Sequence, residues 1–142
     1  MKTEQADKYR EDIVALLRAE KLPVEDLPLS LENFFTEMAD GEIVGVAGIE
    51  IYGDYGLMRS LAVSKSHRGI GLAGKLLQQV ERLAASKNLK TIYLLTETAP
   101  DYFEKKNYEK ITRADVPPVV QKSSEFSHVC PQSAIVMQKK LS

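Results

Sequence analysis

The sequence predicts an α+β fold in which a mixed, mainly antiparallel sheet carries helices on both faces. Short apolar segments separated by glycine-containing turns fill residues 33–63 and indicate a strand meander. A long segment with helical spacing follows over residues 70–84, and a short apolar segment at residues 91–95 comes directly after it. A strand, a helix and a strand in this order imply one parallel pair within the antiparallel sheet.

The first half of the chain is expected to form one helix and a three-stranded antiparallel meander. Residues 4–20 place apolar side chains at helical spacing. Asp40-Gly41 favours a hairpin turn, and residues 53–56 favour a second turn. Gly45 and Gly48 interrupt the second strand and indicate a bulge or close packing there. The predicted strands are residues 33–39, 42–52 and 57–63.

The second half is expected to alternate helices with strands. One apolar stripe defines the longest helix, which Asn88 is expected to end; the stripe is Ile70, Ala73, Leu76, Leu77, Val80, Leu83 and Ala84. A second helix is predicted over residues 100–106, because Asn107 tolerates the left-handed conformation that follows a helix. Pro117-Pro118 predicts a turn or short helix. The remaining strands are expected at residues 91–95, 108–112 and 133–140.

Bulk composition points to one domain over residues 1–142 and to a cytoplasmic protein. The net charge of −1 gives no global basic field for nucleic acid or anionic membrane. No apolar run approaches the ~20 residues of a membrane span, and the first residues lack the apolar core of a signal peptide. The single cysteine, Cys130, excludes an internal disulfide and a thiolate zinc cluster, and no metal is expected.

The segment Ser64 to Gly74 joins the end of an apolar strand to the start of the longest helix. Free N–H groups at a helix start, with the positive end of the helix dipole, bind anions such as pyrophosphate. Gly69, Gly71 and Gly74 leave the backbone accessible, and Arg68 adds positive charge. No Gly-Lys-Ser/Thr closes the loop, so it is not an NTPase phosphate loop. Two alternatives stay open: a dinucleotide-binding Gly-x-Gly-x-x-Gly, and an ordinary glycine-rich helix start.

Arg68-Gly69-Ile70-Gly71-Leu72-Ala73 resembles motif A of the GNAT superfamily of N-acetyltransferases, Arg/Gln-x-x-Gly-x-Gly/Ala, and Leu61-Ala62-Val63 resembles the strand before it. Residues 99–108 resemble the next motif, and the resemblance covers about residues 33–112. It implies a splayed strand pair that binds coenzyme A and acetyl-CoA as co-substrate. It also implies Val63 N–H as the oxyanion donor. The implied coenzyme-binding residues are Leu61, Val63, Arg68, Gly69, Ile70, Gly71, Leu72, Ala73 and Gly74.

A narrower likeness concerns the acceptor. Residues 48–53, 59–61 and 126–134 resemble a short GNAT subfamily known as arsenic-resistance N-acetyltransferases. That likeness implies an arsenical or phosphinate amino acid as the acceptor amine.

An acceptor amine must lose a proton before it attacks the thioester, so the reaction needs a base. Glu50, at the end of a central strand, is the first candidate, ahead of Glu97; a solvated strand-end carboxylate is the alternative. Arg59, with Ser60 beside it, is a candidate for binding an acceptor carboxylate or phosphonate, since its forked donors suit such groups. The alternative for Arg59 is a salt bridge at a sheet edge.

The sequence departs from the family where many members use a tyrosine to protonate the leaving thiolate. Phe103 stands at that position, and Tyr102 lies about 100° round the helix from it. For both residues, the alternative to a catalytic role is a role in packing. Cys130 is expected to be a small buried residue rather than a covalent nucleophile.

The leading prediction is therefore an acetyl-CoA-dependent N-acetyltransferase acting on a small-molecule amine by direct transfer in a ternary complex. A non-catalytic acyl-CoA-binding sensor is the alternative that the missing tyrosine favours, and a nucleotide-binding domain is the third. No nucleic-acid or membrane partner is expected. Residues 134–137 are a candidate segment for a homodimer contact.

Overall fold

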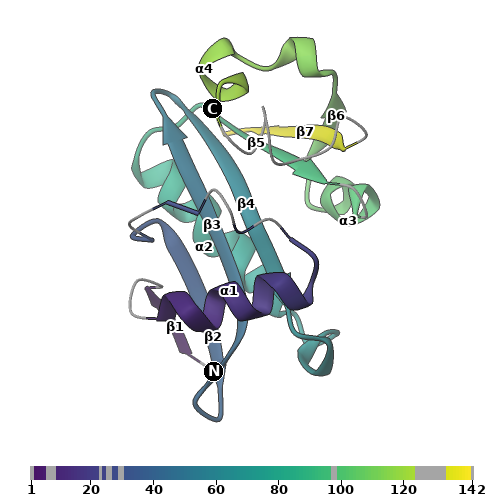
Figure 1. Cartoon of the computed structure of the whole chain (residues 1–142). Coiled ribbons are helices and arrows are strands. Elements are labelled where there is room, and N and C mark those ends of the chain that lie inside the picture. Colours follow the sequence, from purple (N-terminus) through teal and green to yellow (C-terminus); the bar gives the residue numbers. More distant parts are fainter. Residues whose placement is uncertain are drawn as a thin grey trace.

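A seven-stranded sheet forms the centre of the molecule, in the order β1-β2-β3-β4-β5-β7-β6 (Figure 1). The computed structural model describes residues 2–5, 9–22, 24, 27–28, 31–96, 99–123 and 134–141. The strands are β1 (Lys2–Gln5), β2 (Phe34–Ala39), β3 (Glu42–Tyr52), β4 (Tyr55–Val63), β5 (Thr91–Thr96), β6 (Glu109–Ile111) and β7 (Ile135–Lys140). The helices are α1 (Arg10–Ala19), α2 (Leu72–Ser86), α3 (Pro100–Lys105) and α4 (Pro118–Gln121). The predicted α+β class, mainly antiparallel with helices on both faces, is confirmed.

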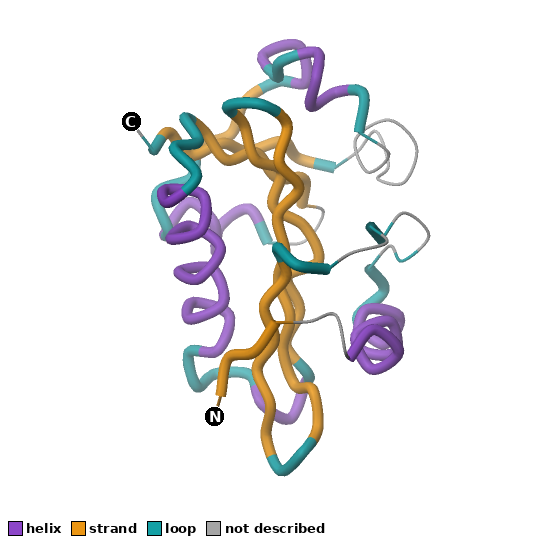
Figure 2. Tube along the Cα trace, turned by 90° about the vertical axis from the view of Figure 1, so that its left-hand side faces the viewer, coloured by secondary structure: helices purple, strands orange, loops and turns teal. Residues whose placement is uncertain are grey.

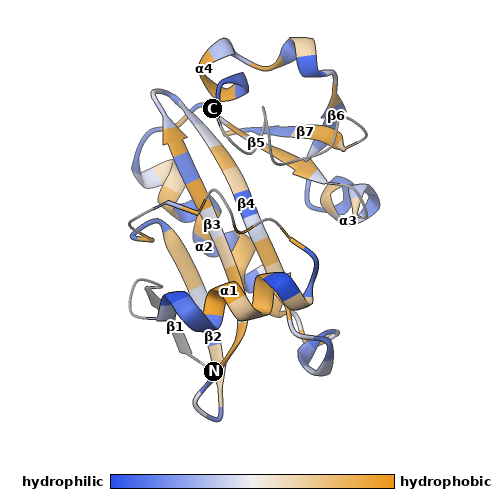
Figure 3. Cartoon of the chain, viewed as in Figure 1, coloured by the Kyte–Doolittle hydropathy of each residue, from blue (hydrophilic) through white to orange (hydrophobic). Residues whose placement is uncertain are grey.

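The helices divide between the two faces of the sheet. Figure 2 shows α2 on one face and α1 and α4 on the other. The apolar side of α1 packs with Phe34, Val46 and Ala62, while α2 covers a separate cluster that includes Ala47, Ile49 and Met58. The central strands are largely hydrophobic, with hydrophilic bands interrupting β3 and β4 (Figure 3). Those bands place polar side chains inside an apolar sheet, where each one requires partners.

The N-terminal prediction was wrong in part. The helix expected over residues 4–20 begins only at Arg10, and Lys2–Gln5 forms strand β1. This strand pairs antiparallel with β2, from Lys2 opposite Met38 to Gln5 opposite Phe35. Pairing with the open edge of β2 satisfies backbone groups that an isolated helix start would leave exposed, so tertiary contact overrides the local pattern.

Gly48 in β3 confirms the expectation of close packing. A Cβ at this position would stand 2.5 Å from ring carbons of Phe34, which is buried beneath α1. A Cβ at Gly45 would instead come closest to the end of the flexible Leu76 side chain, at 2.9 Å, and its other neighbours would lie at an ordinary contact distance of 3.6 Å. The ring of Phe34 therefore determines why β3 has glycine at position 48.

We expect Gly48→Ala to lower the free energy of unfolding by about 1–3 kcal/mol, because overpacking forces a rigid ring to move. Urea denaturation measures this value. Gly45→Ala is the matched control, and its cost should be smaller because the Leu76 side chain can rotate away. Equal losses in the two variants would contradict this explanation.

Candidate functional site

The pairing between β4 and β5 ends early, and among the described residues no strand pairs with the later part of β4 on that side. The two strands are parallel only from Tyr55 opposite Thr91 to Leu57 opposite Tyr93. Figure 1 shows them beginning side by side and then diverging. Ser64 N–H donates to Val44 O (2.8 Å) and so faces β3. Because backbone groups alternate along a strand, the N–H of Val63 faces the diverging side.

A bulge in β4 changes the direction of the strand where the gap opens. The register moves from Gly48 opposite Arg59 to Val46 opposite Ala62, so two residues of β4 face Ala47. Ser60, one of the two, has a left-handed φ of 62°. A bulge bends and twists its strand, and this one separates the paired part of β4 from its open part.

The glycine-rich loop connects the open end of β4 to α2. Gly69 and Gly71 have φ of 84° and 86°, and a Cβ at either would meet no atom within 4 Å. These positions therefore need glycine for backbone conformation and not for space. The first helical bond inside α2 runs from Lys75 N–H to Gly71 O, which leaves the N–H groups of residues 72–74 for another acceptor. With the helix dipole, they favour an anion.

A cleft of about 1560 Å³ runs along this gap, bounded by β4, β5, the loop, α2 and α3. Its lining includes seven Lys or Arg residues and two Glu residues, although the chain has a net charge of −1. The cleft is therefore locally basic and suits a ligand with several negative charges. Of the predicted coenzyme-binding residues, those that line it are Leu61, Val63, Arg68, Gly69, Gly71, Leu72, Ala73 and Gly74.

Ile70 is the predicted coenzyme-binding residue that does not line the cleft. It lies before α2, which begins at Leu72, and it is 60% exposed. The prediction that Ile70 belongs to the apolar stripe of the helix was wrong, and Leu72 is buried instead. The left-handed residues on either side of Ile70 turn it outward, which spacing along the sequence does not show.

Arg68 connects the glycine-rich loop to β4 and to the end of α1. Its Nε donates to Val63 O (3.2 Å), and its guanidinium contacts Glu20 at the end of α1. The first bond also shows that the Val63 carbonyl is directed to the cleft side of β4. The charge of Arg68 is thus already shared with Glu20, and an anion in the loop would compete for it.

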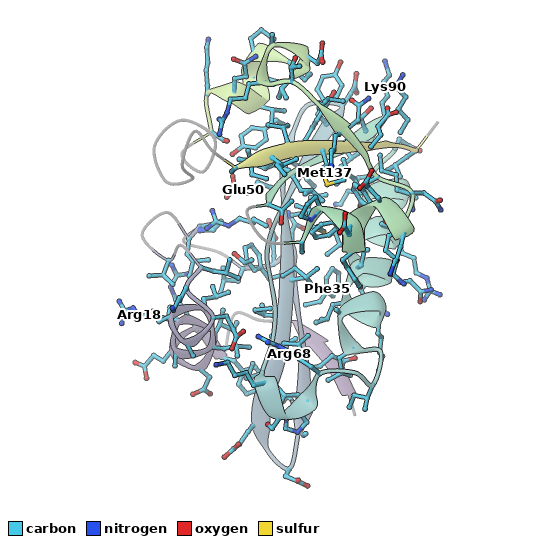
Figure 4. The ribbon with its side chains drawn as sticks, turned by 90° about the vertical axis from the view of Figure 1, so that its right-hand side faces the viewer. Arg18, Phe35, Glu50, Arg68, Lys90 and Met137 are labelled. Atoms are coloured by element: carbon cyan, nitrogen blue, oxygen red, sulfur yellow. The ribbon has the colours of Figure 1, made fainter. Side chains whose placement is uncertain are left out.

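The predicted acceptor residues form one buried cluster on the face that carries α1 and α4. Arg59 Nη1 donates to Glu50 Oε2 at 2.8 Å, and Arg59 Nε donates to Ser60 Oγ at 3.1 Å. The Tyr52 hydroxyl donates to Glu50 Oε1. The Arg59 side chain is fully buried, and that of Glu50 is 15% exposed. Figure 4 shows Glu50 on the side of the sheet nearer α1, opposite Phe35.

The cluster and the cleft meet at β4. Arg59 and Ser60 line the cleft, whereas Glu50 does not. Arg59 and Ser60 therefore belong both to the hydrogen-bonded cluster around Glu50 and to the lining of the cleft. Two residues considered in the sequence analysis, Glu97 and Cys130, lie outside the described residues.

Tyr102 and Phe103 have different surroundings. Phe103 is 6% exposed and packs edge-on against Tyr102 and Tyr108. Tyr102 lines the cleft, and its hydroxyl lies 3.9 Å from where a Cβ on Gly74 would stand. Within the described residues, this hydroxyl is buried without a hydrogen-bond partner. Burial, followed by the charge of Glu81, raises the pKa of Tyr102, so it stays protonated and can donate.

Several residues of the site carried no signal in the sequence. Glu81 of α2 and Lys139 of β7 line the cleft and pair with each other at 3.1 Å. Lys105, the last residue of α3, and Lys106, which follows it, also line the cleft. These side chains converge from separate elements, so no local spacing reveals them. Tyr52 stands two residues after Glu50, and this spacing along a strand could have indicated that the two side chains share a face of the sheet.

Across the described ranges, no three His, Cys, Asp or Glu side chains gather as a metal site would require. In the same part of the chain, each helix is too short or too polar to cross a bilayer.

Solved structures with the same fold include proteins bound to coenzyme A. Rv2747 from Mycobacterium tuberculosis, in complex with CoA and NLQ, has a TM-score of 0.84 and 18% identity, with 100% of each chain covered. A GNAT-family acetyltransferase from Staphylococcus aureus Mu50 has a TM-score of 0.76 and 21% identity, with 99% of each chain covered.

N-acetylglutamate synthase from Neisseria gonorrhoeae, complexed with coenzyme A and N-acetyl-glutamate, has a TM-score of 0.81 and 14% identity. The match covers 99% of this chain and 35% of the synthase, so this chain spans about a third of its length. At such identities, the likeness concerns the fold.

The model of the Acetyltransferase (GNAT) family matches residues 5–111. This range contains the meander, the glycine-rich loop, α2, β5 and α3, so it includes every element that lines the cleft except β7. The chain therefore belongs to the acetyltransferase (GNAT) family.

Proposed function

We propose that this protein transfers the acetyl group of acetyl-CoA to the primary amine of a small molecule, by direct transfer in a ternary complex. The observation that carries the proposal is the basic cleft in which the open edge of β4 leads into the glycine loop. Coenzyme A is a polyanion with a long polar arm. Loop N–H groups suit its pyrophosphate, and the unpaired edge of β4 offers donors and acceptors to the arm.

In this proposal, acetyl-CoA lies in the cleft, and the acceptor approaches from the face that carries α1 and α4. It meets the thioester beside Arg59 and Ser60 of β4, which line the cleft. The ammonium form of the acceptor gives one proton to Glu50, and the neutral amine then attacks the thioester carbon, so that a C–N bond forms. The attacking nitrogen loses its second proton to solvent as the tetrahedral intermediate collapses. The oxyanion accepts a hydrogen bond from Val63 N–H. The C–S bond then breaks, and coenzyme A leaves as a thiolate or takes a proton. Tyr102, protonated and directed at the cleft, is the side chain placed to supply it.

For the acceptor, we propose an amino acid with a second anionic group, including an arsenical or phosphinate amino acid. The buried guanidinium of Arg59 supports this, because it can share its donors between Glu50 and an incoming anion. Ser60, bonded to Arg59, would complete the acceptor site. One structural neighbour, the N-acetylglutamate synthase solved with N-acetyl-glutamate, is consistent with this class of acceptor.

A second candidate function is an acyl-CoA-binding sensor without turnover. The observation that favours it is Phe103, which packs in the core where many family members have the tyrosine. Both candidates share the cleft and differ in whether coenzyme A is released.

We further propose that residues 1–142 form one cytoplasmic domain and that the protein forms a homodimer. Strand β7 is paired on both edges, by β5 and β6. A dimer contact through residues 134–137 would therefore use their side chains and not the addition of a strand.

The proposed function predicts acceptor-dependent release of coenzyme A from acetyl-CoA, detected with a thiol reagent. The acceptors are a panel of amines that includes glutamate and its arsinate and phosphinate analogues. Turnover of an anionic amino acid, with no turnover of the matching neutral amide, is the expected result. Saturable acetyl-CoA binding without release on any acceptor would favour the sensor instead, and no binding would refute both.

A further inference from the structure

Tyr52 is joined to the predicted base by a contact that the proposed chemistry does not use. Glu50 and Tyr52 are two residues apart on β3, so their side chains lie on the same face of the sheet. The Tyr52 hydroxyl donates to Glu50 Oε1, while Arg59 donates to Oε2 at 2.8 Å. The two carboxylate oxygens are thus held by donors from two neighbouring strands, which fixes the plane of the carboxylate.

The surroundings hold the Tyr52 ring in place. It packs against a cluster formed by β4, β5, β7 and α4, whose buried members are Leu57, Tyr93, Val116, Val120 and Val136. The tight turn at residues 53–54 sets Tyr52 directly opposite Tyr55 in the β3–β4 pair. With its ring packed and its hydroxyl on Glu50, Tyr52 connects the carboxylate to a rigid part of the fold.

Tyr52 remains a neutral donor over the working pH range. Burial, followed by the hydrogen bond and negative charge of Glu50, raises the pKa of Tyr52 well above its ordinary value. A hydrogen bond with Ser123, just after α4, and the charge of Arg59 act in the opposite direction and are outweighed. Among the described residues, the titratable groups hydrogen-bonded to Glu50 are Tyr52 on β3 and Arg59 on β4.

We propose that Tyr52 is a positioning residue that, together with Arg59, holds the carboxylate of Glu50 oriented toward the acceptor amine. This inference rests on the proposed function and assigns to β3 a second functional side chain. A carboxylate that loses one hydrogen-bond donor takes up a proton more readily. Tyr52 should therefore set the lower pH limit of activity without touching either substrate.

The test compares Tyr52→Phe with Tyr55→Phe. Both variants keep an aromatic ring in the same cluster, but Tyr55 makes its ring contact with Tyr93 and has no bond to Glu50. In Tyr52→Phe, we expect the acidic limb of the pH profile of kcat/KM to move up by about one pH unit, since hydrogen bonds to charged groups are of that strength. Below the limb, kcat/KM should fall about tenfold, while acetyl-CoA binding stays unchanged. Tyr55→Phe should leave the limb in place.

A second measurement separates this inference from the proposed function. NMR of the protein labelled with ¹³C at its glutamate carboxyl groups reports the pH at which Glu50 takes up its proton. The Glu50→Gln variant assigns the Glu50 signal. This measurement does not depend on catalytic turnover. That pH should rise in Tyr52→Phe and, to a smaller extent, in Ser123→Ala. Because Ser123→Ala leaves the aromatic packing intact, it provides the test if Tyr52→Phe fails to fold.

An unmoved Glu50 signal, or an equal shift in Tyr55→Phe, would overturn the positioning role even if the wild-type protein is an active acetyltransferase. A shifted signal in a protein that acetylates no acceptor would instead refute the proposed function and leave the coupling between Tyr52 and Glu50 established.

Discussion

Gly71→Val is expected to weaken acetyl-CoA binding about 100-fold while the protein remains folded. Gly71 has a φ of 86° at the first position before α2, and a β-branched residue there costs about 3 kcal/mol, which corresponds to about 100-fold in affinity. The strain is relieved if the loop changes conformation. That change would turn the free N–H groups of residues 72–74 away from the cleft. Isothermal titration calorimetry with acetyl-CoA measures the effect.

Gly41→Val is the matched control for this variant. Gly41 has a φ of 81°, a Cβ there would meet no atom within 4 Å, and it lies in the β2–β3 hairpin outside the cleft. The two variants introduce the same backbone strain in open space, so they should lose similar stability. If Gly41→Val weakened binding as strongly as Gly71→Val, the loop would have no specific role in holding the coenzyme.

The loop and its flanking elements could be predicted from the sequence because their signals are local. Glycines that need positive φ, an apolar strand before them and an amphipathic helix after them lie within about thirty consecutive residues. Asn107 at the end of α3 was read in the same way, and its φ of 74° confirms the left-handed conformation expected there. Strand β1 has no comparable signal, since only the edge of β2 makes Lys2–Gln5 a strand.

The electrostatic surroundings of the site could not be predicted, because they depend on which elements meet in space. Arg59 was predicted to bind an acceptor or to form a salt bridge, and the structure places its guanidinium on Glu50. That contact joins two residues nine positions apart, across the β3–β4 pair. Tyr102 is a similar case: only the packing of α3 against Gly74 of α2 brings its hydroxyl to the cleft.

Glu50→Gln should lower kcat by about 10²–10⁴-fold, the usual contribution of a general base. Glutamine keeps the size of the side chain and one oxygen that can accept from Arg59, but it cannot take a proton from the amine. Because the coenzyme cleft does not include Glu50, the affinity for acetyl-CoA should stay within about twofold of the wild-type value. Steady-state kinetics with the best acceptor, together with acetyl-CoA titration, separates the two quantities.

The loss of the ion pair with buried Arg59 will also lower stability, so the kinetics must be measured well below the thermal midpoint of the variant. Glu81→Gln provides the comparison. Glu81 is likewise paired with a cation, Lys139, and accepts from a tyrosine, Tyr108, but it lies on the coenzyme side of the sheet. The Glu81→Gln substitution should change the KM for acetyl-CoA more than it changes kcat. If the two variants lowered kcat equally, the effect would come from the loss of a paired carboxylate in general, and Glu50 would not be the base.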